Sequence, residues 1–313
     1  MVSEVLLPRA VVRAALLLRG SKRVLRSPQR SHKSRSASAL RPARYGPPAR
    51  MESRAEISAQ ASPSGWTVYT VQSSTRAAAP VDVIYLHGGA YTQEMTTTHW
   101  KFIEQLAART GARVVVPIYP LAPTATASLT VPHMVELVSR IGEANAARGL
   151  VIMGDSAGGG MALALTQQLR DLGQRLPDQL ILISPWLDIT VADPRARLIE
   201  ARDPMLAIAG LQGAGLAYAG DLELTDPLVS PLFGNLTGLP PMLCFTGDAD
   251  VLNPDSLTLA DKLTPTDRER FVLERASSEF HVYPLLPTRA GAEARTRVVR
   301  SVATVGASYT QAM

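Results

Sequence analysis

The sequence predicts an α/β protein with a mostly parallel central sheet that is covered by helices on both faces. Short apolar strands alternate with segments of about 12–17 residues that have helical spacing. The strands are nearly continuous hydrophobic runs, such as residues 113–118 (RVVVPI), which is typical of parallel strands buried on both faces. No internal repeat with a period of about 20–50 residues is present, so a solenoid or propeller is excluded.

The first predicted elements lie between residues 66 and 118. Residues 66–71 alternate between apolar and polar side chains, which indicates a strand. Residues 81–86 (VDVIYL) and 113–118 are short apolar runs and indicate buried strands. Residues 98–110 lie between these runs and have helical spacing, so a covering helix is predicted there.

The later elements continue the alternation. Further strands are predicted at residues 149–153, 179–184, 242–246 and 271–274, and further helices at residues 131–147 and 157–172. From about residue 193 to residue 234 the strand signal is weak, and Pro194, Pro204, Pro227 and Pro231 occur. We expect this segment to form cap helices and loops inserted above the edge of the sheet.

The overall composition is that of a globular protein with a sizeable core. Of the 313 residues, 46% are hydrophobic and 19% are charged, which excludes a fully disordered or fibrous chain. No apolar run approaches the roughly 18 residues that a membrane-spanning helix needs. Cys244 is the single cysteine, so a disulfide within the chain and a multi-cysteine metal site are excluded.

The basic residues are concentrated at the start of the chain. Residues 1–55 contain 13 lysines and arginines against two acidic residues, whereas the remainder contains 19 basic and 25 acidic residues. The net charge of +5 therefore comes from a basic head on a mildly acidic body. This distribution does not support a nucleic-acid partner for the whole protein.

The strongest signal for function is a G-x-S-x-G motif at residues 154–158, between the strand at 149–153 and the helix that follows. In this context the motif holds a serine on a sharp strand-to-helix turn, with its hydroxyl exposed above the sheet. Gly154 and Gly158 are expected because a Cβ atom would clash in so tight a turn. A phosphate-binding loop is less favoured, because the expected lysine is missing. Ser156 is therefore the candidate nucleophile.

A second signal is His87–Gly88–Gly89–Ala90, which follows the strand at residues 81–86. Glycines after a strand allow backbone N–H groups to turn into a cleft. The N–H groups of Gly88 and Gly89, together with that of Ala157, would form an oxyanion hole. We expect His87 to brace this turn rather than to transfer protons.

Candidates for the base and the acid follow from chain order. His281 is the one histidine after Ser156, and it lies in a loop after the last predicted strand. His99 and His133 lie in or near upstream helices, where a surface or core position is expected. The acid should lie between the serine and the histidine. We favour Asp250, because apolar residues follow it and could anchor its loop, and Asp248 is the alternative.

These motifs make the sequence similar to the hormone-sensitive-lipase-like esterases of the α/β-hydrolase superfamily, the bacterial carboxylesterase and acetyl-hydrolase branch. The matching pieces are collinear and comprise residues 87–91, 119–123, 154–159, 184–188, 250–252 and 280–284. The sequence departs from the family pattern at Ala90, where a third glycine is usual, at Thr124–Thr126, where a Glu-His-containing sequence is more usual, and at Ser277–Glu279, where glycine and apolar residues are common.

The resemblance implies an α/β-hydrolase fold and a specific set of site residues. It implies Ser156 as nucleophile, Asp250 as acid and His281 as base. It also implies oxyanion donors at Gly88, Gly89 and Ala157, and a cap over the acyl pocket that is built partly from N-terminal helices.

The expected function is that of a serine carboxylesterase. Such an enzyme would hydrolyse short-to-medium-chain esters through an acyl-enzyme on Ser156, with a small-molecule ester as its partner and no metal or organic cofactor. Alternatives on the same residues are an amidase or deacetylase, an acyltransferase, and a membrane-docked lipase. A ligand-binding module without turnover is less favoured, because such modules usually lack a member of the triad, and none is missing here.

We expect two regions along the chain. Residues 1–60 form a basic segment with a cap helix and a linker, and residues 61–313 form the catalytic domain. Apolar residues between 6 and 18 have helical spacing, with arginines among them. Three roles remain open for this helix: an organellar transit peptide, a contact with an anionic membrane, or a lid over the body. A cytoplasmic location is expected, with targeting or peripheral membrane association as alternatives.

Overall fold

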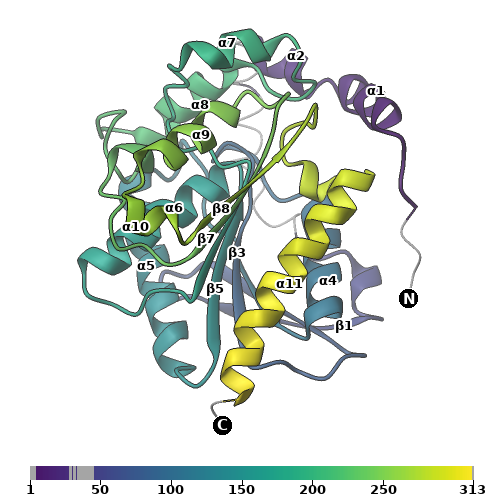
Figure 1. Ribbon diagram of the computed structural model, residues 1–313, viewed down its shortest axis with the longest axis vertical. Coiled ribbons are helices and arrows are strands. Elements are labelled where there is room, and N and C mark those ends of the chain that lie inside the picture. Colours follow the sequence, from purple (N-terminus) through teal and green to yellow (C-terminus); the bar gives the residue numbers. More distant parts are fainter. Residues whose placement is uncertain (1–4, 28–29, 31–32, 34–45, 312–313) are drawn as a thin grey trace.

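The computed structural model describes residues 5–27, 30, 33 and 46–311. Part of the predicted linker lies outside these residues. The predicted fold class is confirmed, since an eight-stranded sheet lies at the centre with helices on both faces (Figure 1). The strand order is β1-β2-β4-β3-β5-β6-β7-β8. The strands are β1 (Ala55–Ala61), β2 (Thr67–Ser73), β3 (Val81–Leu86), β4 (Arg113–Pro117), β5 (Gly149–Asp155), β6 (Gln179–Ile183), β7 (Met242–Gly247) and β8 (Phe271–Ala276).

Strand direction divides the sheet into two parts. Strands β1 and β2 pair antiparallel, as do β2 and β4, whereas all pairs from β4 to β8 are parallel. Every residue of β3, β5 and β7 is buried, which explains their apolar sequences. Because these strands run in one direction, their carboxyl ends meet at one edge of the sheet, where ligands of such folds bind.

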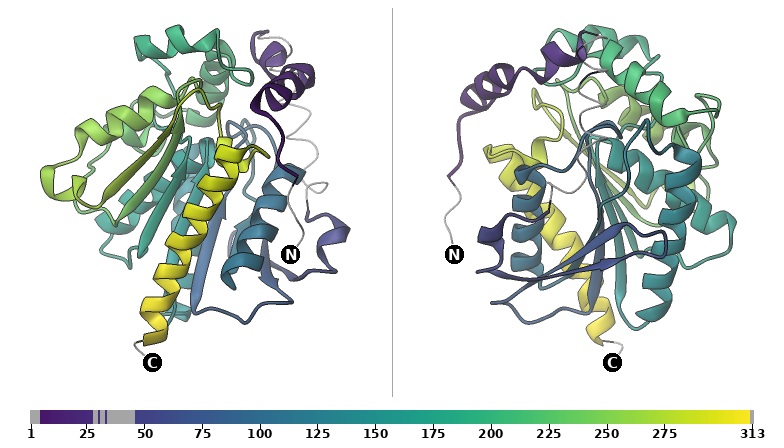
Figure 2. Two further views of the ribbon diagram at one scale, coloured as in Figure 1. Left: turned by 45° about the vertical axis from the view of Figure 1, so that its right-hand side comes forward. Right: turned by 180° about the vertical axis from the view of Figure 1, so that it is seen from behind.

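Helices pack on both faces of the sheet (Figure 2). Helices α4 (Thr97–Thr110) and α11 (Arg289–Gln311) form one hydrophobic core with the strands, and α5 (Ala127–Ala144) and α6 (Ala157–Asp171) belong to another. Helices α9 (Asn253–Lys262) and α10 (Pro265–Arg268) follow β7. Short 3-10 turns are η2 (Ala49–Met51), η3 (Pro231–Phe233) and η4 (Tyr283–Leu285).

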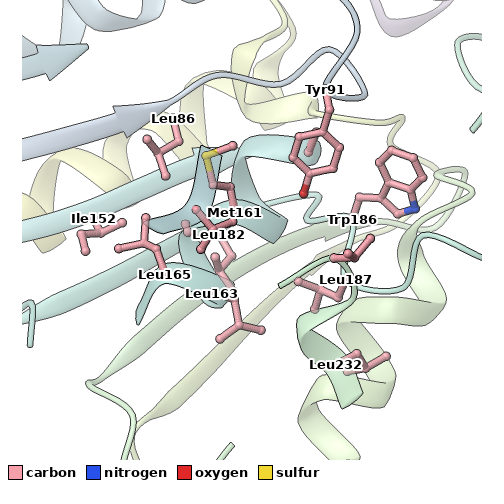
Figure 3. Close-up of a cluster of buried hydrophobic side chains, with 14 of the residues drawn as sticks. Leu86, Tyr91, Ile152, Met161, Leu163, Leu165, Leu182, Trp186, Leu187 and Leu232 are labelled. Carbon is pink, nitrogen blue, oxygen red and sulfur yellow. The ribbon is translucent and has the colours of Figure 1, made fainter. Parts of the chain in front are cut away.

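The position of α6 is fixed by a tightly packed core. Met161 and Leu165 of α6 lie beside Leu86, Ile152 and Leu182 of the three central strands (Figure 3). All five side chains are fully buried. Large-to-small changes in such a core cost about 2–5 kcal/mol each. This packing holds the first turn of α6, and with it the residue that precedes the helix, against the sheet.

Four helices gather above the carboxyl ends of the strands (Figures 1 and 2). Helices α7 (Pro194–Glu200) and α8 (Ile208–Ala219) come from the segment predicted to hold cap helices, and α1 (Arg9–Arg19) and α2 (Ser21–Leu25) come from the basic head. Helix α2 contacts α8, where Gly210 leaves room for Leu25. The Lys22 ammonium donates hydrogen bonds to the carbonyls of Glu200 and Asp203. Among the described residues, no helix is both long and apolar enough to span a bilayer.

Several boundaries differ from the sequence prediction. Strand β1 was not predicted, and it extends the sheet to Ala55, ahead of the division expected at residue 60. Helix α5 begins at Ala127, four residues before the predicted start, and continues through Pro132. Helices α9 and α11 were not predicted. The division into two regions stays a prediction, and its boundary at residue 60 falls within β1, which belongs to the same sheet as the body.

Candidate active site

Ser156 lies on the turn between β5 and α6. Its φ of 54° and ψ of −120° place it in a region that side-chain-bearing residues rarely adopt, which costs about 1–3 kcal/mol. The Ser156 N–H donates to the carbonyl of Ile183 at 2.9 Å. A Cβ at Gly154 would lie 2.2 Å from the Gly158 carbonyl oxygen, and one at Gly158 would lie 2.0 Å from that of Leu86. Both glycines are therefore required for the turn, as the motif predicts.

Asp250 and His281 form a buried pair beside this turn. His281 Nδ1 lies 3.0 Å from each carboxylate oxygen of Asp250. Ser156 and His281 line the same cavity, of about 430 Å³. Burial alone would lower the pKa of His281, but the charge of Asp250 and its hydrogen bond outweigh burial and hold this pKa above its usual value. The three residues chosen from the sequence are thus brought to one place.

The alternative acid, Asp248, lies elsewhere. Its carboxylate accepts a hydrogen bond from Arg275 Nε at 2.6 Å in a solvent-exposed ion pair. Asp250, in contrast, is fully buried. A buried carboxylate paired with an imidazole keeps that ring in one orientation, whereas an exposed ion pair does not act on the ring. The geometry favours Asp250 for the acid role.

The loops that carry the acid and the histidine are tied to each other. The Ala249 N–H donates to the carbonyl of Glu279 at 2.9 Å, and the Val282 N–H donates to Ser184 Oγ at 3.0 Å. The Asp203 carboxylate accepts from the Val251 N–H at 3.0 Å. Burial and the nearby charge of Asp250 raise the pKa of Asp203 to about 6. Asp203 was not predicted, because a carboxylate in a cap segment carries no signal of this long-range contact.

The oxyanion-hole prediction needs one correction, at Gly88. The Gly88 N–H donates to Asp155 Oδ1 at 3.0 Å, so it is already committed. Gly89 and Ala90 line the cavity with φ values of 124° and 51°, and within the described part of the chain no acceptor faces their N–H groups. The N–H of Ala157, at the start of α6, has no intrahelical acceptor. The free donors therefore belong to Gly89, Ala90 and Ala157.

Asp155 is the residue that accepts the hydrogen bond from the Gly88 N–H. This carboxylate also accepts a hydrogen bond from the Tyr85 hydroxyl at 2.5 Å and lies 3.4 Å from His99 Nε2. Burial would raise the pKa of Asp155, but His99 and Tyr85 outweigh burial and lower it. An ionised Asp155 thus anchors the turn through the Gly88 N–H.

His87 braces the same turn. Its ring stacks on Tyr119 with centroids 4.3 Å apart, and its Nδ1 donates to the Gly88 carbonyl at 2.7 Å. Burial, with a smaller contribution from His99, lowers the pKa of His87 to about 4, so the ring is neutral near pH 7. A neutral, buried, stacked ring fits the bracing role expected from the sequence.

Helix α1 covers the two catalytic loops. Val12 and Leu16 of this helix are buried in one apolar cluster with Ala249, Phe280 and Leu286. Ala249 directly precedes Asp250, and Phe280 directly precedes His281. The loops are also reached by the side chains of α1: Arg9 Nη1 donates to the Ser278 carbonyl at 2.9 Å, and the Arg13 guanidinium lies 5.6 Å from the centre of the Phe280 ring. Leu16 and Arg19 of α1 also line the cavity, so its wall includes residues of the basic head.

The chemistry available at this site is that of a protein nucleophile. A hydroxyl on a strained turn, a histidine with an oriented carboxylate and backbone N–H groups without acceptors beside the serine are the parts of an acyl-transfer site. Within the described residues, no group of three or more His, Cys, Asp or Glu side chains is arranged to hold a metal ion.

Comparison with known proteins agrees with this arrangement. A family described as having the alpha/beta hydrolase fold matches residues 83–285. The Triacylglycerol lipase of Mycobacterium tuberculosis is 36% identical over 178 residues, covering 56% of this chain and 36% of the relative. The Esterase of Acinetobacter venetianus is 34% identical over 199 residues, covering 61% and 64%. The chain therefore spans between about a third and two thirds of the length of these two relatives.

The solved structures give the same result. The esterase EstE5, in a crystal soaked with p-nitrophenyl butyrate, has a TM-score of 0.80 at 25% identity and covers 95% of this chain and 98% of its own. Among the sequence relatives, the human Hormone-sensitive lipase is 26% identical over 152 residues, covering 44% of this chain and 13% of the relative. The fold and the site define a member of the α/β-hydrolases. The chain belongs to the α/β-hydrolase fold family, in its hormone-sensitive-lipase-like branch.

Proposed function

We propose that this protein is a serine carboxylesterase. The observation that carries the proposal is the buried Asp250–His281 pair, whose histidine lines the same cavity as Ser156 on its strained turn. The relatives named as lipase, esterase and acetyl-hydrolase support the same reaction type. A small-molecule ester is the proposed substrate. The cavity of about 430 Å³ favours short-to-medium acyl chains.

In this mechanism the Ser156 hydroxyl attacks the ester carbonyl while His281 takes its proton. Asp250 orients the His281 ring through Nδ1 and stabilises the imidazolium that forms. The N–H groups of Gly89, Ala90 and Ala157 bind the oxyanion, a role in which one donor is worth about 10²–10³ in rate. His281 then protonates the leaving alcohol, and water releases the acid from Ser156 by the reverse sequence.

Amide hydrolysis and acyl transfer use the same groups, so the substrate panel must separate them. We expect a fluorophosphonate probe to label Ser156, because the serine oxygen displaces fluoride as it would displace an alcohol. We also expect kcat/KM for p-nitrophenyl esters to be highest between acetyl and octanoyl chains and to exceed that for matched p-nitroanilides. An unlabelled protein would overturn the proposal, and a higher rate on the anilides would make it an amidase.

Helix α1 has a second face, which favours a further role for the basic head. Whereas Leu16 is buried against the body, Leu18 is 87% exposed. More apolar side chains on this segment are exposed: Val5, Leu6, Leu7, Val11 and Leu17. Arginines lie among them. We propose that α1 is a lid whose inner face closes the cavity and whose outer face contacts an anionic lipid surface.

Two leucines on opposite faces of α1 test both halves of this proposal. Leu18→Glu should weaken co-sedimentation with phosphatidylglycerol vesicles about ten-fold or more, since one apolar anchor becomes an anion. Wild-type sedimentation should itself fall in about 1 M salt, where charges are screened. Leu16→Ala should leave vesicle binding intact and shift the preferred acyl chain to longer esters. Sedimentation of Leu18→Glu equal to wild type would refute the membrane role.

A further inference from the structure

Glu94 is a buried carboxylate that the proposed mechanism does not use. It lies in the segment between the Gly88–Ala90 turn and α4, it is only 7% exposed, and it lines the same cavity as Ser156 and His281. Within the described residues its carboxylate has neither a hydrogen-bond partner nor an ion-pair partner. Arg19 of α1 lines the same cavity, but no ion pair joins it to Glu94 in the part of the chain that the structure describes.

Such a group is unusual in a protein interior. Burying a carboxylate without hydrogen bonds costs free energy, so buried carboxylates are normally paired or hydrogen-bonded. Burial raises the pKa of Glu94 to about 7. Asp155 shows the contrast, because it lies nearby with three donors arranged around it. Nothing in the described protein supplies a donor to Glu94, and the cavity is open to a ligand.

The cavity has walls of two kinds. One wall is polar and comes from a single stretch of chain, namely Thr92, Gln93, Glu94, Thr96 and Thr98. The other is mainly apolar and comes from α1, α2, α8 and the segment after His281, with Arg19 and Ser21 as its polar members. An ester bound at Ser156 has two arms, and these walls offer them different environments. An arm that carries a polar donor would be stable only beside the polar wall.

We propose, on the basis of the esterase function proposed above, that Glu94 forms a subsite for a hydrogen-bond donor on the substrate, a hydroxyl or a primary ammonium group. The substrate class is therefore esters in which one arm is polar, such as hydroxy-acid esters, partial esters of polyols or amino-substituted esters. Glu94 would accept the hydrogen bond and would not enter the covalent steps. This is a specificity role, because the donor of the correct substrate satisfies a carboxylate that an apolar substrate leaves unpaired.

The test compares esters that differ only in the donor. On the acyl side, p-nitrophenyl 3-hydroxybutyrate is paired with p-nitrophenyl 3-methylbutyrate, which replaces hydroxyl by methyl. On the alcohol side, 2,3-dihydroxypropyl butyrate is paired with 2-methylbutyl butyrate. For ammonium, p-nitrophenyl 6-aminohexanoate is paired with p-nitrophenyl heptanoate. We expect the wild type to prefer the donor ester in at least one pair by about ten-fold in kcat/KM, the value of one hydrogen bond to a charged acceptor.

Glu94→Met is the informative variant, since it keeps the length of the side chain and removes the acceptor. We expect it to lose the preference and to hydrolyse the apolar ester of the pair faster than the wild type does. Glu94→Gln retains one acceptor oxygen and should keep part of the preference for hydroxyl esters. Glu136→Met is the matched control, because it makes the same substitution at a carboxylate on the surface of α5, where Glu136 pairs with Arg140 outside the cavity. Its preference should equal that of the wild type.

The outcomes separate this inference from the proposed function. If the wild type is labelled at Ser156 and hydrolyses esters but shows no donor preference in any pair, the Glu94 subsite is wrong while the esterase stands. The same holds if Glu94→Met, with full fluorophosphonate labelling as evidence of a folded site, keeps the wild-type preference. If the wild type is neither labelled nor active on any ester, the failure lies in the proposed function.

Discussion

Ser156→Ala is expected to lower kcat for p-nitrophenyl butyrate by about 10⁶. The residual rate would be that of hydrolysis in the same binding site without an acyl-enzyme. The reason is that the variant keeps the oxyanion donors at Gly89, Ala90 and Ala157 but has no oxygen to form the acyl-enzyme. The strained backbone does not complicate this test, since alanine meets the same strain at a φ of 54° as serine does. Stability should therefore remain near that of the wild type.

The measurement is steady-state hydrolysis at enzyme concentrations high enough to detect the residual rate, with thermal unfolding as the control for folding. Fluorophosphonate labelling should disappear with the activity. If Ser156→Ala retained more than about a hundredth of wild-type kcat, Ser156 could not be the nucleophile. A loss of activity accompanied by a large drop in unfolding temperature would instead show that the turn itself had been disrupted.

The fold could be predicted because its parallel strands are buried on both faces. Strands β3 and β5 are apolar at nearly every position, so their sequences alone indicate their environment. Strand β1 was missed for the opposite reason: most of its residues are exposed, and it pairs along one edge only, with β2. Helix α11 buries mainly small residues, glycine, alanine and valine, three or four positions apart, and this stripe gives a weak hydrophobic signal.

The candidate site was predictable where residue type determines the chemistry. A serine in a glycine turn and a histidine after the last strand can be found from the sequence, and the structure brings Ser156 and His281 to one cavity. The oxyanion donors were harder to predict from the sequence, because the direction of a backbone N–H depends on φ and ψ. The sequence alone does not show which of Gly88 and Ala90 has a free N–H group. The structure does, because the Gly88 N–H donates to Asp155.

Glu94 shows a second limit. In the sequence it stands among threonines and a glutamine, which indicates a solvated polar loop. Its burial arises only when helices from the head and from the cap close over the loop, through contacts across long stretches of chain. A local pattern cannot indicate such burial.

Asp250→Asn is expected to lower kcat by about 10⁴, the second-largest loss after that of the nucleophile. An amide can occupy the same volume, but it can present its NH₂ group to His281 Nδ1 and so favour the wrong tautomer, and it supplies no charge to stabilise the imidazolium. Asp248→Asn is the matched control. Its carboxylate pairs with Arg275 at the surface, where such an ion pair contributes at most about 1 kcal/mol, so near-wild-type kcat is expected.

The pH profile gives the Asp250 test a readout that a general loss of folding would not reproduce. His281 must be neutral to accept the proton of Ser156, so kcat/KM rises with pH as His281 loses its proton. Asp250 raises the pKa of His281 in the wild type, so this limb lies at higher pH than it would without that charge. Without the charge of Asp250 the imidazolium is less stable, and the limb should move to lower pH. If Asp248→Asn caused the larger loss, or if Asp250→Asn left the limb in place, Asp250 would not be the residue that orients and charges the base.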